Sequence, residues 1–409
     1  MLNKVLIENY RSCLNTKLNL HPKLSVLIGP NSSGKTNILQ AIMLINKLAL
    51  SRERFPRQER RQVVTSRIKS FFEWANVTAR LNVAIDVFTD NSNNDKVLES
   101  RQRWTFSKGG KKEFTSRLPF SFGRIEYNSI PRAFFFREGR YLIHELHSAD
   151  MPPEWAWKAI RQLTKFCSRI TYYGASQFTN PGSCPPSLEV DRDGDPTSSY
   201  RVRGHGRVLH AMYSASRIHN NPQYKRFLDL VGPKGLRLVD GVTFRVVRSS
   251  STEYSVRVGG KLERRRRENS LVIPQFRIGR QVLSPNQLSE GTFKTLVLVF
   301  HLITDDSSAL LIEEPEVCVH HGLLASILEI IKSASHRKQI VLSTHSDFVL
   351  DHVKPENVLR VTFDKSLGTI VKSIRRSMTA REYSALRDYL DTTGNLGEFW
   401  REGGLGDRP

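Results

Sequence analysis

Residues Leu24 to Ile42 read Leu-Ser-Val-Leu-Ile-Gly-Pro-Asn-Ser-Ser-Gly-Lys-Thr-Asn-Ile-Leu-Gln-Ala-Ile. Four positions in this stretch have the G-x-x-x-x-G-K-[ST] spacing of a phosphate-binding loop: Gly29, Gly34, Lys35 and Thr36. The apolar run from Leu24 to Ile28 predicts a buried strand before the loop, and the periodicity from Asn37 to Leu50 predicts a helix after it. A chance Gly/Ser turn is the alternative, but strand, spacing and helix together favour a nucleoside triphosphate site.

The predicted loop offers a nucleotide three kinds of ligand. Backbone N–H groups of the glycine-rich turn and of the helix N-terminus point at one spot and attract an anion. Lys35 adds a positive charge for the β- and γ-phosphates, and the hydroxyl of Thr36 adds an oxygen ligand for Mg²⁺. The candidate nucleotide-binding residues are Asn31, Ser32, Ser33, Gly34, Lys35, Thr36 and Asn37.

Composition indicates a globular protein with an unusual charge. The chain has 409 residues, of which 39% are hydrophobic and 25% charged, enough for one to three domains. Its net charge of +22 attracts polyanions and favours nucleic acid as a partner, although a basic proteome or a solubility role is the alternative. No apolar run approaches the ~20 residues of a membrane helix, and the N-terminus predicts a strand rather than a signal peptide. The four scattered cysteines predict neither zinc nor a disulfide framework and fit a reducing cytoplasm.

The first half of the chain changes its periodicity twice. Residues from Leu2 to Ile28 alternate like three short strands, and the segment from Asn76 to Tyr127 alternates with period two, which predicts an antiparallel β-lobe inserted after the first helix. Between them lies a basic segment, interrupted by Pro56, for which we expect a loop followed by a short helix. A solvated helix face and a contact with a phosphate backbone are equally favoured interpretations of its charge. Its basic residues are Arg52, Arg54, Arg57, Arg60, Arg61, Arg67 and Lys69.

The middle of the chain predicts a helical insert and a hairpin. Residues 152–170 and 204–231 have helical patterns, with a short strand from Ile170 to Ala175 and a turn-rich connector between them. Val242 to Val258 alternates as a hairpin. The four consecutive arginines Arg264–Arg267 predict a solvated loop tip that also has the charge to contact nucleic acid.

Three motifs in the last third add polar groups at strand and helix ends. Leu288 to Thr292 (Leu-Ser-Glu-Gly-Thr) precedes an apolar helix and is a weak anion-site signal by itself. Ala309 to Glu316 is an apolar run that ends in carboxylates. These acids could simply cap a strand. In a chain that also has a phosphate loop, Glu313 and Glu314 fit Mg²⁺ binding and orientation of the attacking water better. Ile340 to Ser346 is a buried strand whose polar tip places His345 towards the γ-phosphate.

The order of these motifs resembles the ABC-type ATPase heads of the RecF/SMC/OLD group over nearly the whole chain. The opening Ile7-Glu8-Asn9-Tyr10-Arg11-Ser12 is similar to that group's entry motif. The resemblance implies ATP and Mg²⁺ as cofactors and an α/β P-loop head with an inserted antiparallel β-lobe and a helical insert. It also implies these roles: Ser289 and Gly291 in the signature motif, Glu313 as metal-side acid, Glu314 as catalytic base, His345 as switch histidine, Arg11 as nucleotide-sensing arginine and Gln177 in the Q-loop.

Two departures from the family pattern stand in the acidic motif. Glu313 replaces the Asp of most ABC ATPases, and His320-His321 stands where the OLD-like subgroup has His-Pro. The expected organisation is residues 1–50 (strands and phosphate loop), 51–150 (basic segment and β-lobe), 151–240 (helical insert), 241–375 (second part of the head) and 376–409 (tail). For the tail, docking onto the core is favoured over a partner patch.

The resemblance implies an ATPase that forms a homodimer with two ATP molecules sandwiched head to tail. It favours an ATP-gated, nucleic-acid-associated component of bacterial anti-phage defence that controls an effector protein such as a nuclease or toxin. A DNA repair ATPase of RecF type is the alternative, and a transporter ATPase is disfavoured by the β-lobe and by the charge. A nuclease within the same chain is disfavoured because fewer than ~50 residues follow the last strand pair.

Overall fold

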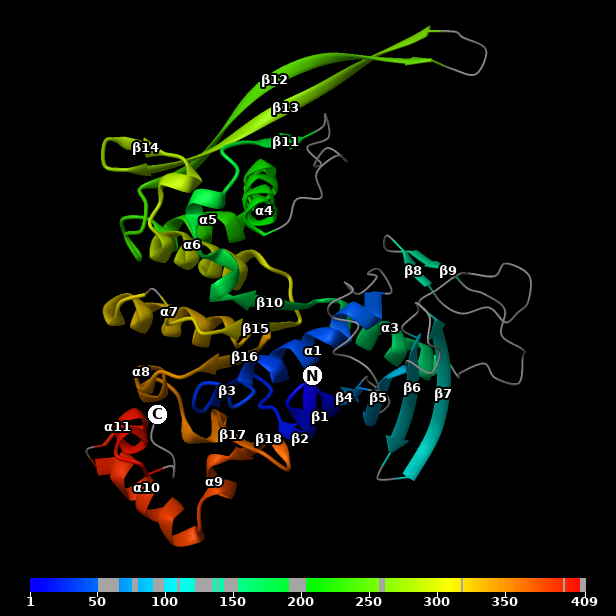
Figure 1. The fold of residues 1–409 in the computed structure, drawn as a ribbon, viewed down its shortest axis with the longest axis vertical. Helices are drawn as coiled ribbons and strands as arrows, with labels where there is room; N and C mark the ends of the chain where they lie inside the picture. Colours follow the sequence, from blue (N-terminus) through cyan, green and yellow to red (C-terminus); the bar gives the residue numbers. More distant parts are fainter. Residues whose placement is uncertain are drawn as a thin grey trace. The chain divides into compact units, whose positions relative to one another are not determined.

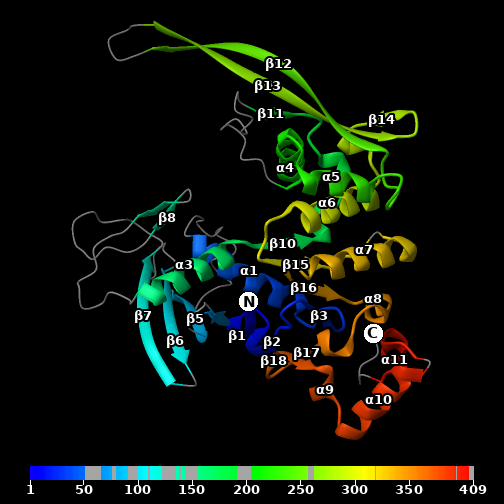
Figure 2. The same cartoon turned by 180° about the vertical axis from the view of Figure 1, so that it is seen from behind.

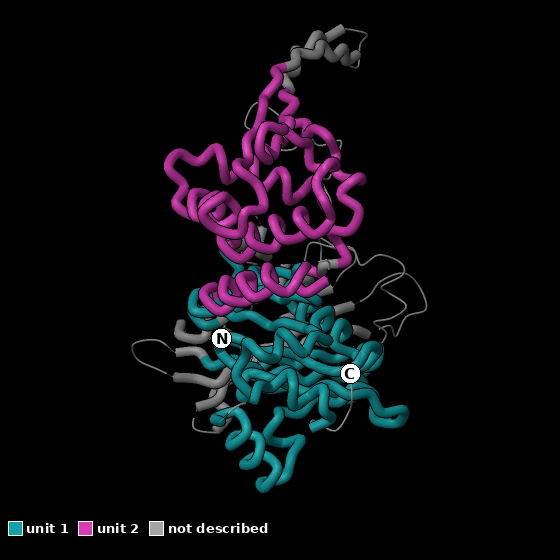
Figure 3. Tube along the Cα trace, turned by 90° about the vertical axis from the view of Figure 1, so that its left-hand side faces the viewer, with its two compact units in different colours: residues 1–173, 306–314, 335–409 teal, residues 174–305, 315–334 magenta. Residues whose placement is uncertain are grey.

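The computed structural model divides the chain into two compact units. Unit 1 comprises residues 1–173, 306–314 and 335–409, and unit 2 comprises residues 174–305 and 315–334 (Figure 3). The structure describes residues 1–50, 66–75, 80–90, 99–108, 111–121, 135–137, 140–142, 154–190, 204–256, 262–317, 319–392 and 394–404. The basic residues from Arg52 to Arg61 lie outside these ranges, as do residues 191–203 of the turn-rich connector. Among the described residues, no helix is both long and apolar enough to span a bilayer.

A mostly parallel sheet carries the phosphate loop in unit 1. Its strand order is β10-β15-β16-β3-β17-β18, in which β15, β16, β3 and β17 are parallel neighbours and β18 is antiparallel (Figure 1). Strands β3, β15 and β16 are buried along their whole length, as expected for a parallel sheet covered on both faces. The strands are β3 (Leu24–Ile28), β10 (Ile170–Gly174), β15 (Ala309–Glu313), β16 (Gln339–Thr344), β17 (Val358–Asp364) and β18 (Gly368–Ser373).

A second, antiparallel sheet of unit 1 contains the predicted β-lobe. Its order is β2-β1-β4-β5-β6-β7, so the inserted strands continue the N-terminal hairpin through the pairing of β4 with β1. The strands are β1 (Leu2–Tyr10), β2 (Cys13–Asn19), β4 (Arg67–Ala75), β5 (Arg80–Asp90), β6 (Glu99–Lys108) and β7 (Lys111–Ser121), and a separate ribbon joins β8 (Phe135–Arg137) and β9 (Arg140–Leu142). Arg67 and Lys69, at the end of the basic segment, lie in β4, where Ile68, Ser70 and Phe72 are buried with period two. Residues 51–65 of this segment lie outside the described ranges, so its loop and short helix stay predictions.

Helix α1 (Lys35–Leu50) joins the two sheets into one core. Its buried residues Ile38 and Ile42 belong to the same apolar cluster as Val5 and Ile7 of β1 and as Leu311 of β15. Helix α3 (Glu154–Ser168) packs against α1 and adds Ala159, Leu163 and Cys167 to this cluster. Because α1 begins at the phosphate loop, burial of its apolar face fixes the direction in which the loop leaves β3.

The C-terminal segment docks on unit 1, as the sequence favoured. The helices here are α8 (Asp347–Asp351), α9 (Ile374–Ser377), α10 (Ala380–Thr392) and α11 (Leu396–Arg401), with the 3₁₀ turn η5 (Pro355–Asn357). Helix α11 packs on α8: Trp400 is 4% exposed, the Gly397 N–H donates to Asp351 Oδ1 at 2.8 Å, and Arg401 Nε lies 3.0 Å from Asp347 Oδ2 (Figure 2).

In its described residues, unit 2 combines four helices with a small antiparallel sheet. The helices are α4 (His205–Arg217), α5 (Pro222–Val231), α6 (Glu290–Thr304) and α7 (His321–Ala334), and the 3₁₀ turns are η2 (Ala175–Phe178), η3 (Pro181–Ser183) and η4 (Pro285–Gln287). The sheet joins β11 (Leu188–Val190), β12 (Gly241–Val256), β13 (Leu262–Ile278) and β14 (Gln281–Leu283). The predicted loop tip at Arg264–Arg267 was wrong, because these residues are part of β13 and pair with Tyr254 to Ser251 of β12.

Candidate nucleotide-binding site

The predicted phosphate loop connects β3 to α1. At two of its positions, no residue larger than glycine fits. Gly34 has φ +103, and a Cβ there would lie 2.0 Å from Thr369 Oγ1. A Cβ at Gly29 would lie 2.1 Å from the carbonyl oxygen of Val361. Both separations are far below a van der Waals contact, so the glycines allow the loop to pack directly on β17 and β18.

Thr369 of β18 fixes this loop to the antiparallel edge of the sheet. Its side chain is fully buried; Oγ1 donates to the carbonyl of Ser33 at 3.1 Å and shares a 2.8 Å hydrogen bond with Ser12 Oγ. Ser12 Oγ in turn accepts from Asn37 Nδ2 of α1 at 2.7 Å. The sequence analysis missed Thr369, and no signal in the sequence links it to a loop 336 residues away.

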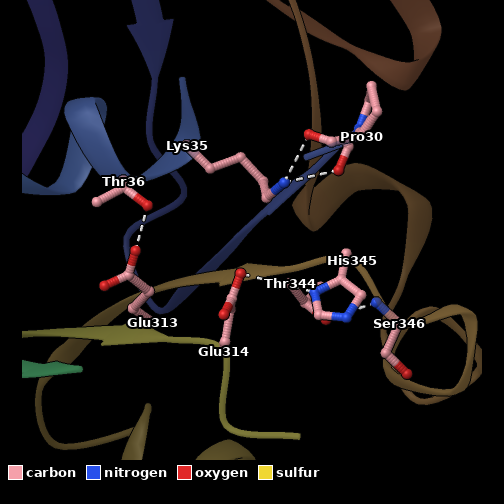
Figure 4. A network of polar contacts seen from close by, with 9 residues as sticks. Pro30, Lys35, Thr36, Glu313, Glu314, Thr344, His345 and Ser346 are labelled. Atoms are coloured by element: carbon pink, nitrogen blue, oxygen red, sulfur yellow. Dashed lines mark hydrogen bonds and ion pairs between the residues drawn. The ribbon is translucent and has the colours of Figure 1, made fainter. Parts of the chain in front are cut away.

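The loop carries the groups that a triphosphate needs. Lys35 Nζ donates to the carbonyls of Gly29 and Pro30 at 2.7 and 2.9 Å, so its charge is held directly over the loop (Figure 4). Ser33 Oγ is buried and has no hydrogen-bond partner among the described residues, which is costly unless a ligand supplies one. Asn31 and Ser32 are exposed at the tip of the loop. These residues fit a nucleoside triphosphate.

Glu313 ends β15 opposite the first residues of α1. One of its carboxylate oxygens accepts a hydrogen bond from the Thr36 hydroxyl (Figure 4). The other accepts one from the Tyr172 hydroxyl of β10. A hydroxyl and a carboxylate in contact form an oxygen donor set that suits Mg²⁺. Burial, reinforced by the hydrogen bond to Glu313, raises the pKa of Tyr172, so the phenol stays a proton donor to Glu313 at neutral pH. Tyr172 was not identified in the sequence, because its role depends on β10 lying next to β15.

Glu314 and His345 form a second polar pair at the ends of β15 and β16. Glu314 Oε1 lies 3.6 Å from His345 Nδ1, and both side chains are partly exposed, at 35% and 45% (Figure 4). Glu314 has φ +48, a left-handed conformation that is strained for a residue with a Cβ, and its N–H donates to the carbonyl of Ser343 at 2.9 Å. Such strain is retained where the surrounding structure imposes it, and it clusters at functional sites.

Arg11 lies beside α1. Its guanidinium donates to Asn37 Oδ1 at 3.3 Å and to Gln40 Oε1, and it stacks over the ring of Tyr10 at 5.5 Å. The side chain is exposed, and the residue has φ +51 in the turn between β1 and β2. Unit 1 therefore brings together Arg11, Lys35, Thr36, Asn37, Glu313, Glu314 and His345 around the N-terminus of α1 and the adjoining strand ends.

The other predicted residues belong to unit 2. Ser289 is the N-cap of α6 and accepts a hydrogen bond from the Thr292 N–H at 3.2 Å, so the helix N-terminus begins at the Leu-Ser-Glu-Gly-Thr motif. A cavity of about 420 Å³ adjoins this motif and is lined by Ser289, Gly291 and Thr292 together with Arg237 and His320. Gln177 is exposed in η2, which packs against α6.

Comparison with known proteins finds one AAA family model in each half of the chain. A family model described as AAA ATPase domain matches residues 1–107, and a second, described as AAA domain, putative AbiEii toxin, Type IV TA system, matches residues 206–351. The DNA replication and repair protein RecF of Lactococcus lactis subsp. cremoris (strain SK11) is 32% identical over 88 residues, which are 20% of this chain and 24% of that protein. RecF of Staphylococcus epidermidis (strain ATCC 12228 / FDA PCI 1200) is 46% identical over 41 residues, 10% and 11% of the two chains.

Among solved structures, the chain is similar to SMC heads at low identity. The SMC head domain from Thermotoga maritima is 13% identical, with 91% of this chain and 98% of that chain covered and a TM-score of 0.41. The SmcHead bound to the C-winged helix domain of ScpA is 10% identical, with 92% and 99% covered and a TM-score of 0.47. The matches to RecF span a quarter or less of those relatives' length.

The parallel sheet, the phosphate loop and the acids at the end of β15 define a P-loop head of the ABC type. The AAA family models and the RecF matches support an ABC-type ATPase of the RecF/SMC group. The resemblance seen in the sequence is thereby confirmed.

Removal of the Tyr172 hydroxyl tests its contact with Glu313. Tyr172→Phe leaves one oxygen of a buried carboxylate without its donor, so we expect the apparent affinity for Mg²⁺ in nucleotide binding to fall about fivefold, or ~1 kcal/mol. The measurement is titration of a fluorescent ATP analogue with Mg²⁺ varied. Tyr173→Phe, which removes the same group from the opposite face of β10, is the control and should leave the Mg²⁺ dependence unchanged. Equal effects of both substitutions would contradict the assignment.

Proposed function

We propose that this chain binds and hydrolyses ATP as a switch that closes into a homodimer. The observation that carries the proposal is the placement of Glu313 against Thr36, with Glu314 and His345 beside them, at the end of the sheet where the phosphate loop enters α1. Ligands of open α/β sheets bind at the carboxyl ends of the strands, and this arrangement supplies charge, metal ligand and base at that edge.

Each residue of unit 1 has a defined task in this proposal. Lys35 exchanges its contacts with the loop carbonyls for the β- and γ-phosphates, and Ser33 and Asn37 complete the cradle. Thr36 and Glu313 would hold Mg²⁺, which would neutralise charge on the triphosphate. Glu314 accepts a proton from the attacking water, and His345 holds the Glu314 carboxylate in place through its ring nitrogen. Arg11 adds a positive charge beside the first turn of α1.

The signature motif of unit 2 supplies the second half of the composite site in the proposed dimer. Ser289 and Gly291 lie at the positive end of the α6 dipole and line a cavity that an anion can enter. We propose that they meet the γ-phosphate bound by the partner protomer and that Gln177 senses the same phosphate from η2. Hydrolysis removes this contact, so the dimer opens after each turnover.

Nucleic acid is the proposed macromolecular ligand, supported by the net charge of +22. Two roles fit an ATP-gated, nucleic-acid-associated ATPase. We propose the ATPase component of an anti-phage defence system that controls an effector such as a nuclease or toxin, which the AbiEii description of the second family model supports. A role in DNA repair is the alternative, supported by the RecF relatives. The gene beside this one discriminates between them: a nuclease or toxin gene favours defence.

Glu314→Gln tests the proposed base. Glutamine keeps the size of the side chain but cannot take up a proton, so we expect ATP turnover to fall by about 10²–10⁴-fold while ATP binding is retained. Phosphate release and equilibrium nucleotide binding measure the two effects separately. Glu329→Gln on the exposed face of α7 is the matched control. Unchanged turnover in Glu314→Gln would remove Glu314 from the mechanism.

Ser289→Arg tests the composite site. A large side chain at the N-cap of α6 blocks the approach of a second protomer. With ATP, Glu314→Gln alone should therefore dimerise, whereas the double variant Ser289→Arg/Glu314→Gln should stay monomeric. Light scattering after size-exclusion chromatography gives the mass. Ser366→Arg, in the exposed turn between β17 and β18, is the control. If Ser289→Arg leaves both dimerisation and turnover intact, the sandwich model is wrong.

Salt dependence tests nucleic-acid binding. If the basic surface neutralises Z phosphates of a DNA duplex, log K falls with log salt concentration at a slope of about −0.9Z. We expect a slope of several units between 50 and 200 mM salt, by fluorescence anisotropy, and a change in affinity when ATP is added to Glu314→Gln. A flat salt response would show that the charge has another purpose.

A further inference from the structure

One edge of the unit 2 sheet has no strand beside it among the described residues. The sheet order is β11-β13-β12, and β14 also pairs with β13, so β13 is central and β12 is an edge strand (Figure 1). The backbone N–H and C=O groups of β12 that point away from β13 are therefore available to a further strand. Val246 of β12 is 46% exposed, and natural proteins usually protect such an edge with charge or proline.

A cavity of about 600 Å³ is lined by residues of β12 and of two helices. Phe244, Val246 and Arg248 line it from β12. Because side chains alternate along a strand, these three point to one face of the sheet and Arg245 points to the other. Helix α4 contributes Tyr213 and Arg217, and α5 contributes Tyr224.

Tyr224, which lines this cavity, carries a buried hydroxyl without a partner among the described residues. The residue is 8% exposed, and its hydroxyl makes no hydrogen bond within the described part of the chain. An unsatisfied buried hydroxyl costs ~1–3 kcal/mol, which an acceptor entering the cavity would recover. Burial raises the pKa of Tyr224 to about 12, so the group is a donor at neutral pH.

The charge of the cavity selects an acidic ligand. Two guanidinium groups line it: that of Arg217, which lies over the Tyr213 ring at 5.7 Å, and that of Arg248, which is exposed. As far as the chain is described, the lining contains no carboxylate. Carboxylates of an incoming chain would find both arginines and the Tyr224 hydroxyl as donors.

The aromatic residues argue against single-stranded nucleic acid as the ligand. Bases stack on exposed ring faces, whereas Tyr213 and Tyr224 are only 7% and 8% exposed. A peptide strand needs no ring face. It pairs through its backbone and inserts alternate side chains into a groove. The open edge, the exposed valine and the groove along one face of the strand match this second mode.

We propose that β12 and the adjoining cavity bind an extended, acidic peptide segment of a partner protein, which adds to the sheet as a strand antiparallel or parallel to β12. The inference rests on the proposed function in one respect: the partner that carries the acidic segment would be the effector protein. Binding itself requires no ATP, because all the residues involved lie in unit 2.

The test uses a fluorescein-labelled peptide of about ten residues with alternating valine and glutamate, the length of a long strand. Anisotropy with the full chain, without nucleotide, should show saturable binding. Arg248→Glu should weaken it about tenfold through reversal of a contacting charge. Arg245→Glu changes the net charge equally on the opposite face of β12 and should change the affinity less than about twofold.

Two further comparisons separate strand addition from general attraction. Val246→Lys places a charge on the open edge and should abolish binding, whereas Val282→Lys, at an exposed valine of β14, should not. A peptide N-methylated at its odd positions and one N-methylated at its even positions should differ in affinity, because only one of the two sets of amides faces β12. Thermal melting and ATP turnover of the four variants should match the parent, so loss of peptide binding is distinguishable from failure of the ATPase.

Three results would overturn the proposal. The first is no saturable binding of the peptide. The second is equal weakening by Arg248→Glu and Arg245→Glu or equal affinity of both N-methylated peptides, which would show ionic attraction only. The third is displacement of the peptide by an oligothymidine whose own binding depends on Arg248, which would assign the cavity to nucleic acid.

Discussion

The contact between the Thr369 side chain and Gly34 holds the nucleotide site in shape. Thr369 is fully buried, and its hydroxyl bonds to the loop at Ser33 and to the first hairpin at Ser12. A methyl group at Gly34 would overlap this hydroxyl, so the loop and β18 can approach only because residue 34 has no Cβ. The first hairpin, the phosphate loop and the last strand of the sheet thus depend on one close packing contact.

Parallel pairing brings the chemical groups to a common edge. Strand β16 lies between β3 and β15, with Thr344 opposite Ile28 and Ser343 opposite Glu313. The loop after β3 is consequently a neighbour of the acids at the end of β15 and of His345 after β16, although Thr36 and Glu313 are 277 residues apart. Glu314 takes a strained backbone conformation there, and the hydrogen bond from its N–H to Ser343 keeps it in place.

Much of the fold and of the unit 1 site was predictable from local pattern. The strands from Leu2 to Ile28, helix α1, the buried strands β15 and β16 and the docked tail agree with the sequence analysis. The arginine run was assigned wrongly, because charge suggested a loop while 16 residue pairs of β12 and β13 extend the hairpin through it. Arg67 and Lys69, at the end of the basic segment, belong to β4, where Ile68, Ser70 and Phe72 are buried with period two.

The sequence by itself determined the chemical groups and their order: a glycine-rich loop with Lys35 and Thr36, two acids after an apolar strand, and a histidine after the next. It could do so because these motifs are contiguous and their spacing reflects local backbone geometry. Only the tertiary structure decided which groups touch. Tyr172 on Glu313, Thr369 on Gly34 and the open edge of β12 all arise from strand neighbours that are distant along the chain, and local periodicity contains no information about such pairing.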